Sequence, residues 1–152
     1  MATINATIAI NSGDLTSSPI SINNTMTMLK AGTCHGLENT SGLVRRTFTA
    51  TTEVDLVATG AQMYGTPTAT TNANKLYIKN TGTSSTDYVS IAMGDATGGE
   101  ELDDGSSKIT LGRLYGGDWM LIPYHGATNV GDVLIAPSTA ETTTVEWMLF
   151  FE

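Results

Sequence analysis

Apolar and polar residues alternate along most of this chain, and the alternation is clearest in its second half. In the segment 144–152, Val145, Trp147, Leu149 and Phe151 fall at every second position. Successive side chains of a β-strand point to opposite faces, so this period indicates a strand with one buried face. We therefore predict that the chain closes on a core strand.

Similar runs recur from the start of the chain. The run 3–10 has Ile4, Ala6, Ile8 and Ile10 on one face, which predicts a strand with one buried side. A second strand region spans roughly residues 20–28, with a bulge or turn expected at Asn23 and Asn24. Helical periodicity is absent throughout. About nine or ten short strands at this spacing predict an all-β fold, an antiparallel β-sandwich or barrel.

Segments poor in apolar residues separate these runs. The stretches 32–42 and 60–74 read as loops, the second long and exposed, with Pro67 and a threonine-rich run. A tight turn is expected at residues 116–118, directly before a strand that begins at Trp119. Both tryptophans, Trp119 and Trp147, are expected in the core.

The composition agrees with one β domain over residues 1–152. Only 14% of the residues are charged, and threonine, which suits a pleated surface, is abundant. The formal net charge of -8 argues against binding to nucleic acid or to an anionic membrane, since both need basic residues. A single cysteine, Cys34, leaves no internal disulfide, and no signal peptide or membrane span is evident, which favours synthesis in a cytosol.

Candidate catalytic chemistry is sparse. Cys34 and His35 are adjacent and His125 is the only other histidine, so at most three favoured zinc ligands come from two distant loops. Adjacent residues of an extended segment also point apart, which disfavours a cysteine–histidine catalytic pair. A loop thiol and two solvated imidazoles are the preferred interpretation. We predict no catalytic residues, no cofactor and no enzyme activity.

The acidic segment 95–105 is the strongest candidate for ligand chemistry. Its carboxylates on a glycine-rich loop are suited to Ca²⁺, which accepts roughly six to eight oxygen ligands. The candidate ligands are Asp95, Glu100, Glu101, Asp103 and Asp104. Their spacing differs from that of an EF-hand, and a solvated hairpin loop is the preferred alternative.

Four residues are candidates for contact with a partner protein. Arg45 and Arg46 lie beside apolar Val44, and a guanidinium can pair bidentately with a partner's carboxylate. A pair on a strand surface is the commoner arrangement. Tyr64 and Pro67, in the uncharged segment 60–74, are the other expected contacts.

A family resemblance rests on segments of the second half. These are Lys75-Leu76-Tyr77-Ile78-Lys79-Asn80-Thr81-Gly82, Asp87-Tyr88-Val89-Ser90-Ile91, the run from Leu111 through Gly116-Gly117-Asp118-Trp119 to Pro123, and the closing strand. Together they resemble small structural proteins of tailed bacteriophages. The resemblance covers residues 75–152 and carries no catalytic motif.

The resemblance implies a virion protein made in the host cytoplasm. It implies a capsid decoration (cement) protein with a jelly-roll-like sandwich, acting as a homo-oligomer, most simply a homotrimer, on the major capsid protein or another virion protein. The alternative is a fibre or tail-associated module that recognises a carbohydrate or host receptor. Copy number per particle separates the two.

Overall fold

The computed structural model describes residues 4–13, 20–29, 37, 39–49, 51, 53–57, 74–94, 108–124, 133–138 and 142–151. These residues form only β structure and no helix, which confirms the predicted all-β, antiparallel class. The strands are β1 (Asn5–Ser12), β2 (Ile20–Thr27), β3 (Asn39–Thr40), β4 (Val44–Phe48), β5 (Val54–Val57), β6 (Asn74–Asn80), β7 (Tyr88–Gly94), β8 (Lys108–Tyr115), β9 (Trp119–Tyr124), β10 (Val133–Pro137) and β11 (Thr143–Phe151).

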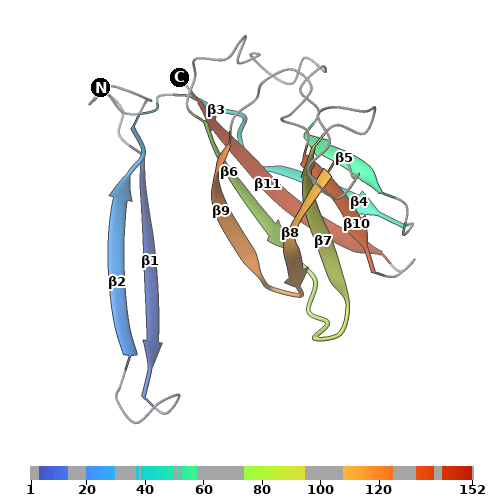
Figure 1. Ribbon diagram of the computed structural model, residues 1–152, viewed down its shortest axis with the longest axis horizontal. Helices are drawn as coiled ribbons and strands as arrows, with labels where there is room; N and C mark the ends of the chain where they lie inside the picture. The colour runs from blue at the N-terminus through green and yellow to red at the C-terminus, as the bar shows by residue number, and fades with distance from the viewer. Residues whose placement is uncertain are drawn as a thin grey trace.

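Two of the three sheets form a β-sandwich (Figure 1). One has the order β5-β10-β7-β8, and the other has β3-β11-β6-β9 with β4 also paired to β11. All of their strand pairs are antiparallel. The third sheet contains only β1 and β2 and stands beside the sandwich (Figure 1).

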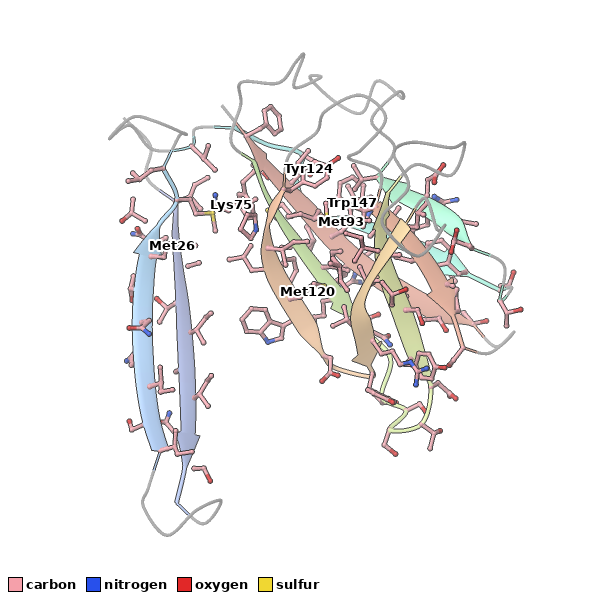
Figure 2. All side chains as sticks on the ribbon, viewed as in Figure 1. Met26, Lys75, Met93, Met120, Tyr124 and Trp147 are labelled. Atoms are coloured by element: carbon pink, nitrogen blue, oxygen red, sulfur yellow. The ribbon has the colours of Figure 1, made fainter. Side chains whose placement is uncertain are left out.

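The core lies between the two larger sheets. It takes Val89, Ile91 and Val133 from one sheet and Ile78 and Trp147 from the other, all almost completely buried. Figure 2 shows the Trp147 and Met93 side chains within the sandwich. The prediction that the closing strand is a core strand is therefore confirmed.

Strand β11 is central to its sheet. It pairs with β6 on one side and with β3 and β4 on the other. Between β3 and β4 the ladder is interrupted at Gly42, whose φ of 72° is a conformation that favours glycine. There the Ser41 hydroxyl accepts a hydrogen bond from the Leu149 amide at 2.9 Å, so that no donor of β11 is left unpaired at the break.

The two sheets are tied together at one end by Asn80. Its buried amide donates to the Leu114 carbonyl across the sandwich at 3.0 Å, while its side-chain oxygen accepts from the Gly82 amide at 2.9 Å. The predicted turn at 116–118 is confirmed: Gly117 has a φ of 89° and donates to the Asn80 carbonyl at 3.0 Å. The backbone carbonyl of Asn80 thus anchors the turn that leads into β9, while its buried side chain joins the two sheets.

Two expectations about individual residues are wrong. Asn23 and Asn24 form no turn, because both lie within β2 in an unbroken register opposite Ala9 and Ile8. Trp119 is not a core residue, since it is 49% exposed. The register of β9 turns Met120, Ile122 and Tyr124 toward the core and leaves Trp119 on the outer face of the sheet.

Candidate interaction surface

The two-stranded sheet of β1 and β2, called the ribbon below, has one polar face. Its register pairs asparagine, threonine and serine side chains across the strands. Thr7 and Thr25 share a hydrogen bond between hydroxyls at 2.9 Å, Ser21 donates to Asn11 and Thr27 donates to Asn5, each also at 2.9 Å. Three polar pairs of this face are therefore hydrogen-bonded across the ribbon, and Asn23 lies opposite Ala9.

The opposite face of the ribbon is mostly apolar. We call it the apolar ribbon face and define it by Ala6, Ile8, Ile10, Ile20, Ile22 and Met26; two polar residues, Asn24 opposite Ile8 and Ser12 opposite Ile20, lie on the same face. Ile10 and Ile22 are directly paired and are 52% and 43% exposed. The predicted period-two pattern is confirmed, but the expected burial is wrong for Ile8 and Ile10, which are 42% and 52% exposed.

A groove of about 210 Å³ separates the ribbon from the sandwich. Residues 4–8 line it on one side and Tyr77, Trp119, Leu121 and Phe150 on the other, with Met28 completing the lining. The Tyr77 and Trp119 ring centroids lie 6.3 Å apart. Every lining residue is uncharged, so the groove is a neutral region of a strongly acidic molecule.

The surroundings of Tyr77 change the pKa of its phenol. Burial raises the pKa of its phenol, and the nearby Glu146 carboxylate raises that pKa further. Both effects disfavour the phenolate, one by removing water and the other by charge repulsion. Tyr77 is therefore kept neutral, and its half-buried ring lines one side of the groove.

Arg45, a predicted partner contact, already has a partner within the chain. Its guanidinium forms an ion pair with Glu146, which lies opposite it in the β4–β11 register. The Glu146 side chain is only 10% exposed, whereas that of Arg45 is 70% exposed. The pair compensates a buried carboxylate, and the outward side of the guanidinium still faces solvent.

Arg46 points to the other side of β4. Its guanidinium donates to the Asp55 carbonyl at 2.8 Å and lies 5.0 Å from the centre of the Phe48 ring. Because β4 and β5 belong to different sheets, this contact joins the two layers. The two adjacent arginines are thus placed apart and hold the sandwich together in different ways.

A second hollow, of about 240 Å³, lies at the end of the sandwich near Asn80. Thr83, Ser84, Asp87 and Thr142 contribute polar groups to it. The Ser84 hydroxyl accepts from the Asp87 amide at 3.0 Å and from the Thr86 amide at 3.2 Å. Much of its polar lining therefore organises the local loop. Among the described residues no three histidine, cysteine or carboxylate side chains cluster as metal ligands.

The other predicted site residues lie outside the described part of the chain. They are Cys34, His35 and His125, the candidate calcium ligands Asp95, Glu100, Glu101, Asp103 and Asp104, and the contact candidates Tyr64 and Pro67. Those predictions remain predictions.

The apolar ribbon face was missed as a surface by reasoning from the sequence. Alternation shows that a strand has an apolar face and does not show what covers that face. One signal was present: neither β1 nor β2 contains a charged residue. Exposed strands that avoid unwanted association commonly carry charges, proline or bulges, and this ribbon has none of them.

No family model, curated protein or solved structure matches the chain. In the described residues, no helix is long and apolar enough to cross a membrane.

Proposed function

We propose that this protein is a non-catalytic virion structural protein, a capsid decoration protein that binds a phage head shell as a homo-oligomer. The observation that carries the proposal is the ribbon, which presents an uncharged, mostly apolar face on a molecule whose net charge is -8. Contiguous exposed apolar surface on a β module is typical of an assembly contact. The ribbon would provide such a contact in every copy.

The strand order supports a jelly roll. Counting from β4, one sheet has the first, eighth, third and sixth strands and the other has the second, seventh, fourth and fifth. Eight strands wound in two sheets in this manner are the jelly-roll arrangement, which viral capsid domains and lectins use. The order therefore supports both the fold implied by the phage resemblance and a place in a virion.

The charge suits a protein present in many copies. A net charge of -8 keeps free copies soluble and apart, while the neutral ribbon allows contact at one defined place. A ligand that binds only the assembled shell stabilises it by mass action, and a homotrimer would match the local threefold positions of a shell.

The second candidate is a receptor-binding module of a fibre or tail. The polar hollow beside Asp87, Thr83 and Ser84 favours it, because hydroxyl and carboxylate groups are suited to a sugar. Tyr88 and Tyr115, with ring centroids 5.5 Å apart, add an aromatic pair on the neighbouring strands β7 and β8. Lectins also use jelly rolls.

The number of copies per particle separates the two candidates. Quantitative gel analysis of intact, purified particles should give hundreds of copies, comparable with the number of shell subunits. A handful of copies, or recovery with isolated tails alone, would reject decoration and favour the receptor-binding module.

A further inference from the structure

We propose that copies of this protein associate with one another through the apolar ribbon face, so that the occupant of this face is the same face of a second copy. The proposal deepens the proposed function and rests on it for the expectation that copies self-associate. It adds the element and the residues that make the contact, with Ile10 and Ile22 at its centre.

The ribbon is too small to be stable by itself. A two-stranded sheet is marginal in water unless an apolar face packs against something else. The strands are eight residues each, paired in regular register, and their polar face is already satisfied. The stabilisation that is missing is therefore a layer over Ile8, Ile10, Ile22 and Met26.

The described part of the sandwich faces only one end of the ribbon in the same copy. Only residues 4–8 of the strand β1 region line the groove against the sandwich. Figure 1 shows the ribbon beside β9, with its far end projecting beyond the end of that strand. Ile10 pairs with Ile22 toward this far end and lies outside the groove lining. Closing the groove would leave that pair uncovered.

Charge also limits how copies can meet. Each copy carries a net charge of -8, so copies repel one another overall. Neither strand of the ribbon has a charged residue. The apolar ribbon face is therefore a place where two copies of an acidic protein meet without electrostatic cost.

The face can also meet its own copy. Ile10 and Ile22 lie side by side on it, and a face that meets the same face of a second copy satisfies the requirement of a symmetric contact. Two ribbons stacked at the usual sheet separation of about 10 Å bury the face, and so do three ribbons that turn their faces toward a shared axis. Both arrangements use the same residues.

The test compares two double variants of the full-length chain by sedimentation velocity over a range of concentrations. Ile10→Thr with Ile22→Thr removes apolar groups from the face and keeps β-branched side chains. Ala9→Thr with Asn23→Thr is the matched control, because this pair is adjacent in the ladder and lies on the polar face. Neither variant changes the net charge. Melting curves of both monomers should match that of the parent, since all four positions are exposed.

We expect the parent and the control to self-associate alike and the face variant to associate at least about 100-fold more weakly, since each copy loses two buried isoleucines. A parent chain that stays monomeric at every concentration would overturn the inference. Equal association of both variants would overturn it too.

A second pair of variants reports proximity directly. In a Cys34→Ser background, Ile22→Cys should form a disulfide between copies under mild oxidation and Asn23→Cys should not. Equal cross-linking of the two would contradict a contact through the apolar face.

Particle binding of the same variants keeps this inference separate from the proposed function. If the face variant self-associates normally but no longer binds particles, the shell is the occupant of the face; the inference then fails while the decoration function stands. If no variant and no parent binds particles, yet the face variant alone loses self-association, the inference stands and the decoration function fails.

Discussion

At the scale of the residue, the sandwich contains a few buried polar groups whose partners come from distant parts of the chain. Among the described residues, Asn80 and Glu146 are the buried polar side chains: Asn80 bonds across the two sheets, whereas Glu146 pairs with Arg45 within one sheet. The sequence could not reveal these pairings, because Arg45 and Glu146 are separated by 101 positions and meet only through the β4–β11 register. A buried polar group without its partner would cost about 1–3 kcal/mol.

Gly116 gives the sharpest prediction at this scale. A Cβ at this position would lie 2.6 Å from the Ser84 carbonyl oxygen and 2.7 Å from the Ser84 nitrogen, both backbone atoms that cannot swing away. We expect Gly116→Ala to lower the free energy of unfolding by about 3 kcal/mol, as overpacking of a close contact does. Urea denaturation measures the change.

Gly13→Ala is the control for this substitution, because nothing lies within 4 Å of the added Cβ. It should alter stability by no more than about 0.5 kcal/mol. Equal stability of the two variants would mean that the 81–87 segment moves freely away from the turn.

Tyr77 gives a prediction about pH. Burial and Glu146 raise the pKa of its phenol, so the folded chain holds this proton to higher pH than the unfolded chain does. The corresponding stability is complete below the unfolded pKa of about 10 and is lost as the pH rises through the folded pKa. The parent and Tyr77→Phe are both titrated by ultraviolet absorbance, and the difference between the two curves reports Tyr77. Its midpoint should lie above the ordinary phenol pKa of about 10.

Glu146→Gln should lower that midpoint partway toward the ordinary value, because it removes the repulsion and leaves the burial. A midpoint at or below about 10 in the parent would contradict the described surroundings of Tyr77.

At the scale of the element, the strands differ in what the sequence could predict about them. Val145, Trp147 and Leu149 alternate and are buried, as expected. Ile8 and Ile10 alternate equally well and are exposed. The difference lies in the layer that faces each strand, which is a property of the tertiary arrangement and not of the strand. Trp119 was misplaced for the same reason, since the register of β9 decides which of its two faces is inside.

Strand β11 should be indispensable. Removing residues 147–152 deletes three buried side chains, Trp147, Leu149 and Phe151, and strips β3 and much of β6 of their pairing partner. Each lost side chain costs on the order of 3 kcal/mol or more, against a total stability of about 5–15 kcal/mol. We expect no cooperative unfolding transition in this truncated chain.

Removal of residues 1–27 is the contrasting truncation. It deletes the ribbon, whose strands pair only with each other in the described part of the chain. The sandwich should then keep a cooperative thermal transition. A chain that folds without 147–152 but fails without the ribbon would reverse the roles assigned to the two elements.

At the scale of the whole molecule, a protein of net charge -8 carries a projecting ribbon whose two strands have no charged residue. The class of the fold followed from period-two alternation and short strand spacing, whereas the ribbon's separation from the sandwich did not. The candidate loop residues, including Asp95 and Glu100, lie outside the described ranges. We propose that the apolar ribbon face is what the described residues contribute to function, and we predict that it serves assembly.

The most direct measurement is imaging of purified particles at a resolution that traces the sandwich. The account predicts this fold at many symmetry-equivalent positions on the head, with ribbons of neighbouring copies in contact through Ile10 and Ile22. Density for the sandwich only at the tail, in a few copies and with its ribbon directed away from any neighbour, would contradict the account.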